Sequence, residues 1–325
     1  MGHIVTFYSY KGGVGRTFAL ANTAVLLAAS GYRVLVVDWD LEAPGLDKFF
    51  ENFSITSAHR PGGILKILES YNLDQTLQWR DYIEKVVFEF DGELAFLPSG
   101  YALESYQQRL ADFSWVDFYE RGGGERIEAL RADWVSGYDF VFIDSRTGVT
   151  DAGGVCTIQL PDTLVLVFTA SQQSLTGTVN IANRVQRARQ QSDFAPLQAT
   201  LIPLLSRWDG RDEKVEGELW LKRVEYAVSP FLSSWVASGE SHRRVIEALR
   251  VPHVAYFSFG EKLAVLMGSL TDPLLPGQAF ATLAALLIES SWTKVSVTRD
   301  EICARTTKSH RFFLLRELLH NHGLS

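Results

Sequence analysis

The chain has 325 residues, 46% of them hydrophobic and 21% charged, and a formal net charge of −7. This composition is typical of a folded globular protein, and it excludes an intrinsically disordered chain. The acidic balance argues against a surface given over as a whole to nucleic acid.

Three features of the sequence indicate the cellular compartment of the protein. Cys156 and Cys303 stand in no metal-ligand spacing, and two isolated thiols fit a reducing compartment better than a disulfide framework. No apolar run approaches the ~20 residues that a membrane-spanning helix needs. The N-terminal residues lack the pattern of a signal peptide. We therefore expect a cytoplasmic protein.

Short apolar runs alternate with helical stretches along the chain. The expected strands lie at about residues 4–8, 33–37, 86–90, 94–97, 139–143, 163–168, 198–204 and 253–257. The expected helices include residues 17–30, 63–71, 124–134 and 177–190. Near-continuous apolar strands are buried on both faces. The pattern predicts an α/β fold, with a mostly parallel, twisted sheet of about seven or eight strands and helices on both faces.

No Pro/Gly/Ser-rich linker divides the chain, which indicates one domain over residues 1–290 followed by a helical extension over residues 291–325. The stretch 206–240 is the least regular part of the pattern and carries many charges. We expect this stretch to be a lid or a partner surface.

A glycine-rich segment joins the first expected strand to the first expected helix. From Lys11 to Thr17 it reads Lys-Gly-Gly-Val-Gly-Arg-Thr. Glycines let several backbone N–H groups turn toward one anion, and the helix that follows adds the positive end of its dipole. The Thr17 hydroxyl stands where a P-loop Ser or Thr holds Mg²⁺. The segment therefore predicts a phosphate-binding loop of the P-loop NTPase fold.

The loop departs from the pattern G-x-x-x-x-G-K-[ST] at two positions, since Tyr10 replaces the first glycine and Arg16 replaces the lysine. Lys11 followed by two glycines resembles the deviant Walker A loop of the ParA/MinD-type P-loop ATPases, and Arg16 resembles a KGGVGR variant of it. The resemblance implies an ATPase with ATP and Mg²⁺ as ligands, whose rate depends on whether Arg16 can replace the lysine. It also implies an ATP-dependent homodimer in which Lys11 reaches the partner's nucleotide.

Acidic residues follow two of the expected strands. Asp38 and Asp40 form an Asp-x-Asp pair after the second strand, and Asp144 ends an apolar run. By resemblance, Asp38 and Asp144 join Thr17 around Mg²⁺, and Asp40 positions the attacking water. The expected catalytic residues are Lys11, Arg16 and Asp40. The expected cofactor-binding residues are Lys11, Gly12, Gly13, Val14, Gly15, Arg16, Thr17 and Phe18, with Ser206, Arg207 and Pro252 near the nucleotide base.

Two further features of these loops stay open. Arg146 stands where the family usually has proline, and it could contact phosphate, a partner subunit or solvent. The phosphate loop, from Gly13 to Phe18, also begins like the dinucleotide fingerprint G-x-G-x-x-G, with Asp38 near the position of a ribose-binding acid. Phe18 occupies the third glycine position, where it would crowd the helix against the strand, so the dinucleotide interpretation is the weaker one.

The sequence leaves open what an ATP-dependent dimer of this kind acts on. A protein partner fits the acidic balance, whereas nonspecific DNA binding would use two clusters of arginines. These are Arg184, Arg187 and Arg189, and Arg243, Arg244 and Arg250. Membrane association would use the amphipathic residues 308–320, which could equally pack on the domain. A protein that binds ATP without turnover is a further alternative.

Overall fold

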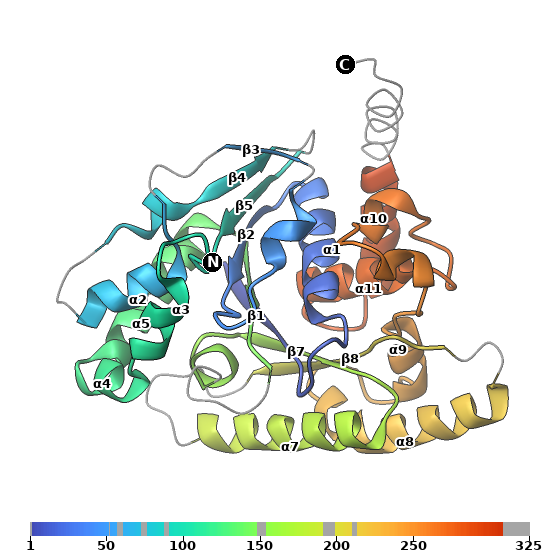
Figure 1. The fold of residues 1–325 in the computed structure, drawn as a ribbon. Coiled ribbons are helices and arrows are strands. Elements are labelled where there is room, and N and C mark those ends of the chain that lie inside the picture. The colour runs from blue at the N-terminus through green and yellow to red at the C-terminus, as the bar shows by residue number, and fades with distance from the viewer. Residues whose placement is uncertain are drawn as a thin grey trace, which may run out of the picture.

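The structure is a computed structural model that describes residues 2–51, 53–56, 61–72, 77–87, 91–147, 154–190, 199–209 and 213–307. Within these residues, strands of one sheet lie in the order β3-β4-β5-β2-β6-β1-β7-β8 (Figure 1). Their bounds are β1 His3–Tyr8, β2 Arg33–Asp38, β3 Ser54–Thr56, β4 Glu84–Val87, β5 Glu93–Leu97, β6 Phe140–Asp144, β7 Thr163–Phe168 and β8 Thr200–Leu205. The pairs β3–β4 and β4–β5 are antiparallel, and the other pairs are parallel. The mostly parallel α/β fold is confirmed.

Helices cover both faces of this sheet. They are α1 Arg16–Ala29, α2 Ile64–Asn72, α3 Tyr106–Asp112, α4 Trp115–Glu120, α5 Gly123–Gly137, α7 Gln172–Arg189, α8 Lys214–Leu232, α9 His242–Ala248, α10 Ala264–Met267 and α11 Pro276–Glu289. Short 3-10 helices lie at Leu46–Phe49, Trp79–Tyr82 and Ala255–Ser258, and a π-helix at Val155–Gln159. Figure 1 shows α1, α10 and α11 on one face of the sheet and α2 to α5 on the other.

The side chains of the strands belong to two separate hydrophobic clusters, because successive side chains point to opposite faces of the sheet. On β6, Phe142 lies in the cluster with α1 and α11, whereas Val141 and Ile143 lie in the cluster with α2 and α5. The central strands β1, β2, β6 and β7 are buried along almost all of their length, which explains why they appear as continuous apolar runs.

The topology determines where the polar ends of the strands meet. The strand β6 lies between β2 and β1, with Asp38 opposite Asp144 and Phe7 also opposite Asp144. Carboxyl ends of parallel strands share one edge of a sheet, which is where ligands bind in open α/β folds. The loop after β1 and the acids after β2 and β6 are therefore neighbours.

Two expectations about the second half of the chain are wrong. Residues 253–257 form no strand: Trp208 and Pro252 make only an isolated bridge, and Ala255–Ser258 is a 3-10 helix. Pro252 has no N–H to donate, and the pairing ends after the N–H of His253 donates to the carbonyl oxygen of Trp208. The stretch 206–240 is not irregular either, because α8 fills most of it and buries apolar residues at helical spacing. The short strand β3 was not predicted.

The C-terminal part is described only as far as residue 307. Residues 295–307 are helical, and Val295, Ile302 and Cys303 belong to the cluster around α11. The boundary at residue 290 stays a prediction, and the amphipathic residues 308–320 lie outside the described residues. Within the part of the chain that the structure describes, no helix combines the length and apolarity needed to cross a membrane. Cys156 and Cys303 are both free and buried.

Candidate functional site

The phosphate loop lies between the end of β1 and the first residue of α1. Gly13 has a φ of 72° and Gly15 a φ of 90°, a left-handed conformation that residues with a Cβ adopt rarely. Val14 between them is buried, and the Ser9 hydroxyl donates to the carbonyl oxygen of Lys11 at 2.9 Å. The glycines at these two positions are therefore required by the backbone, and the loop leads directly into the N-terminus of α1.

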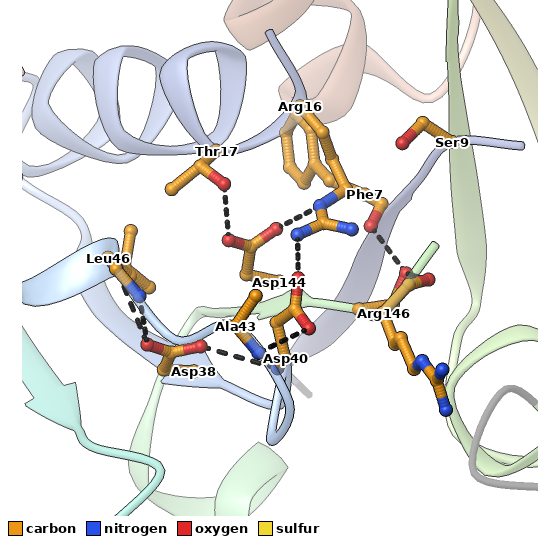
Figure 2. A network of polar contacts seen from close by, with 12 residues as sticks. Phe7, Ser9, Arg16, Thr17, Asp38, Asp40, Ala43, Leu46, Asp144 and Arg146 are labelled. Carbon is orange, nitrogen blue, oxygen red and sulfur yellow. Dashed lines mark hydrogen bonds and ion pairs between the residues drawn. The ribbon is translucent and has the colours of Figure 1, made fainter. Parts of the chain in front are cut away.

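Arg16, the first residue of α1, turns its side chain toward the acidic strand ends. Its Nε donates to Asp144 Oδ1 at 2.5 Å, and its Nη2 donates to Asp40 Oδ2 at 2.6 Å (Figure 2). Only 8% of Arg16 is exposed. Burial opposes its charge, but Asp144 and Asp40 outweigh that effect and raise the pKa of Arg16. The guanidinium is thus a buried cation that bridges two carboxylates.

Asp144 receives a second hydrogen bond, from the Thr17 hydroxyl at 2.7 Å. Burial raises the pKa of Asp144, and Arg16 and Thr17 partly offset that rise. The threonine hydroxyl and this carboxylate stand side by side, as expected for two groups around Mg²⁺. Among the described residues, no group of three or more acidic, His or Cys side chains is arranged to hold a metal. The oxygen pair still fits Mg²⁺, because that ion keeps most of its waters and takes only one or two carboxylates.

Asp38 uses its carboxylate within its own loop. Its two oxygens accept from the N–H groups of Asp40 at 3.3 Å, Gly45 at 3.2 Å and Leu46 at 3.3 Å. Burial, followed by the nearby Asp144, raises the pKa of Asp38 to about 8, although the N–H donors of Leu46 and Gly45 oppose the rise. Asp38 therefore shapes the loop that presents Asp40, and its expected place around Mg²⁺ stays a prediction.

Arg146 forms an ion pair with Glu42, which follows Asp40 in the same loop. Its side chain points away from Asp40 (Figure 2) and is 31% exposed. The preceding Ser145 donates to the carbonyl oxygen of Phe7 at 2.9 Å, which ties this loop to β1. The structure shows a further role for Arg146, a partly exposed ion pair between two loops, and its contact with phosphate or a partner subunit stays a prediction. The sequence also predicts that Gly148 lets this loop approach the γ-phosphate, but Gly148 lies outside the described residues.

Tyr10, at the position of the first glycine, packs against α7. A Cβ added at Gly177 would lie 2.2 Å from the Tyr10 ring, so this close approach requires glycine. The Ser171 hydroxyl caps α7 by accepting from the N–H of Ser174 at 3.4 Å. Tyr10 departs from the P-loop pattern in the sequence, but only the fold brings it into contact with Gly177. This contact ties the residue before the phosphate loop to α7.

The residues expected near a nucleotide base are only partly brought together. Ser206 lies against the phosphate loop, since a Cβ at Gly15 would be 3.2 Å from its Oγ. A cavity of about 380 Å³ beside α8 is lined by Pro252 and Trp208, and neither Ser206 nor Arg207 contributes to its lining. The Phe18 side chain packs among the aromatic rings of Phe49, Phe257 and Phe280. The role of these residues at a base stays a prediction.

The arginine clusters are only partly available at the surface: Arg184, Arg187 and Arg244 are exposed, but other members are engaged. Arg189 is 1% exposed and donates to the carbonyl oxygen of Pro161, so it is not available to a phosphate backbone. Arg243 forms ion pairs with Glu218 and Glu247. Helical spacing alone did not reveal that α7 turns Arg189 toward the sheet.

Comparisons with known proteins agree with this geometry. Residues 2–195 match the family model AAA_31, described as an AAA domain. The septum site-determining protein MinD of Helicobacter pylori is 30% identical over 178 residues, which cover 54% of this chain and 56% of that relative. The matched segment therefore covers little more than half of that relative's length.

Two solved structures share the fold. The septum site-determining protein MinD of Pyrococcus horikoshii in complex with Mg-ADP superposes with a TM-score of 0.56 at 18% identity, over 88% of this chain and 96% of that one. A Cyanothece McdA variant in complex with ATP superposes with a TM-score of 0.53 at 15% identity, over 94% of this chain and 96% of that one. At these identities, the likeness to solved structures shows the fold alone.

Proposed function

Because the chain belongs to the ParA/MinD-type P-loop ATPases, we propose that it binds and hydrolyses ATP as a cytoplasmic homodimeric switch that acts on a protein partner. The observation that carries the proposal is the convergence of Arg16, Thr17, Asp40 and Asp144 beside the phosphate loop. These groups come from α1, the loop after β2 and the end of β6. A P-loop ATPase needs a phosphate cradle, a cation and acidic groups at one place.

Each group has a role in this proposal. The N–H groups of residues 13–17 hold the phosphates and stabilise the charge that develops during transfer. Thr17 and Asp144 hold Mg²⁺, directly or through its waters, while Asp38 fixes the adjacent loop. When bound, Mg²⁺ neutralises the phosphate oxygens. Asp40 orients the attacking water. The KGGVGR variant implies that Arg16 supplies the charge that lysine supplies elsewhere.

Lys11 is the residue proposed to act between subunits. It is partly exposed on the phosphate loop, and the described residues include no ion pair to its ammonium. The proposed homodimer places Lys11 of each subunit at the phosphates of the other. A protein target is favoured over DNA because the net charge is −7 and Arg189 is buried.

The experiment measures Mg²⁺-dependent phosphate release from ATP and the molar mass of the protein with and without ATP. Wild type is expected to release phosphate and to dimerise with ATP. Asp40→Ala is expected to bind ATP and dimerise while its turnover falls by about 10²-fold or more. Turnover in Asp40→Ala equal to that of wild type would remove Asp40 from the proposed role.

A second pair of variants tests whether Lys11 acts across the dimer interface or whether the loss of any positive charge has the same effect. Lys11→Ala is expected to lose ATP-dependent dimerisation. Lys48→Ala is the matched control, because Lys48 is exposed and pairs only with Glu51 at 3.6 Å among the described residues. ATP-dependent dimers of Lys11→Ala as abundant as those of Lys48→Ala would contradict the crossing-lysine role.

A further inference from the structure

The contacts of Arg16 join three separate segments of the chain. The guanidinium belongs to the first turn of α1, Asp40 to the loop after β2, and Asp144 to the carboxyl end of β6. We call Arg16, Asp40 and Asp144 the arginine clasp. All three residues are at least nine-tenths buried. The clasp occupies the two carboxylates that the proposed function needs for Mg²⁺ and for the attacking water.

The clasp depends on the shape of the arginine side chain. A planar guanidinium presents several N–H donors in a fixed fork, so that Nε and Nη2 can reach different carboxylates at once. A lysine ammonium is a compact point charge on a flexible stem and lacks this fixed fork. The replacement of the usual lysine by Arg16 therefore gives Asp40 and Asp144 two donors in a fixed geometry, where a lysine would offer one mobile ammonium.

The third nitrogen of the guanidinium, Nη1, is the one that neither carboxylate contacts. Nη1 is buried and makes no hydrogen bond to any residue that the structure describes. It points away from both carboxylates (Figure 2). A buried donor without an acceptor costs free energy, and a phosphate oxygen is an acceptor suited to a guanidinium. Arg16 thus keeps one buried donor that no described residue uses.

We propose that the arginine clasp makes the binding of ATP and the binding of Mg²⁺ depend on each other more strongly than a P-loop lysine would. The inference rests on the proposed function. Without nucleotide, Arg16 neutralises Asp40 and Asp144 and competes with a metal cation. When Arg16 turns to the phosphates, the two carboxylates lose their cation and Mg²⁺ replaces it.

The thermodynamics of this coupling are reciprocal. If ATP raises the affinity for Mg²⁺ by some factor, Mg²⁺ raises the affinity for ATP by the same factor. Any P-loop protein shows some coupling, because Mg²⁺ also contacts the phosphates. With the clasp, ATP binding in the absence of Mg²⁺ also carries the free-energy cost of leaving two buried carboxylates without a cation. The extra coupling is expected to be about tenfold or more, which corresponds to about one charged hydrogen bond.

The test measures ATP affinity by calorimetry in EDTA and in saturating Mg²⁺, for wild type and Arg16→Lys. The ratio of the two affinities is expected to be at least about tenfold larger in wild type. Mg²⁺ without nucleotide is expected to leave the melting temperature of wild type unchanged and to raise that of Arg16→Lys. Arg33→Lys, at an exposed ion pair of the same sheet, is the matched control and should match wild type.

The outcomes separate the two proposals. An equal Mg²⁺ effect on ATP affinity in wild type and Arg16→Lys would overturn the coupling and leave the proposed function intact. No ATP binding by folded wild type would overturn the proposed function and the coupling with it. If Arg16→Lys fails to fold, Asp40→Asn replaces it, because a neutral acceptor weakens one arm of the clasp and should also reduce the coupling.

Discussion

The two ends of strands β2 and β6 carry charged pairs with different surroundings. At the amino ends, Arg33 and Asp139 form an ion pair at 2.9 Å, with side chains 51% and 39% exposed. At the carboxyl ends, Arg16 meets Asp144 at 2.5 Å, with side chains 8% and 2% exposed. Water screens the first pair, whereas the second pair has lost its water and depends on its partners. The exposed pair therefore contributes little to stability, whereas each charge of the buried pair needs a partner of opposite charge.

The largest expected effect comes from removing the cation of the buried end. Arg16→Ala leaves Asp40 and Asp144 without the guanidinium that both contact, and uncompensated buried charge is strongly destabilising. We expect the free energy of unfolding to fall by about 3–5 kcal/mol. Urea denaturation without nucleotide or metal measures it. A variant as stable as wild type would show that water already neutralises this end.

A smaller effect is expected from Asp38→Ala at the same end. The substitution leaves the N–H groups of Asp40, Gly45 and Leu46 without their acceptor. Because burial raises the pKa of Asp38 to about 8, its removal relieves little charge at neutral pH. We expect a loss of about 1–3 kcal/mol. Faster amide hydrogen exchange at Gly45 and Leu46 would locate the change, and unchanged exchange there would contradict the loop-holding role.

The smallest effect is expected at the exposed end. Arg33→Ala should leave the urea midpoint at pH 7 nearly unchanged, because exposed ion pairs contribute little. The Arg33 guanidinium lowers the pKa of Asp139, so the contribution of the pair is present above about pH 4 and is lost as the pH falls below it. Midpoints of wild type and Arg33→Ala should converge at low pH. A loss at pH 7 as large as that of Arg16→Ala would end the contrast between the two ends.

Much of this arrangement follows from sequence. The alternation of apolar runs with helical stretches gives the strands β1, β2, β5, β6 and β7 within about a residue of their bounds. Parallel strands that end in acids imply that these acids share one edge with the phosphate loop. The Arg16, Thr17, Asp40 and Asp144 contacts agree with that expectation. The left-handed φ of Gly13 and Gly15 gives the physical reason for glycine at both positions.

The sequence by itself determined the fold class, the phosphate loop and the acids beside it, because strand periodicity and glycine spacing are local properties of the chain. The tertiary structure alone decided which partner each side chain found. It directed Arg16 to two carboxylates, buried Arg189 and placed Tyr10 against Gly177. Such contacts join residues far apart in the chain, and their geometry depends on how helices pack on the sheet, which no local pattern records.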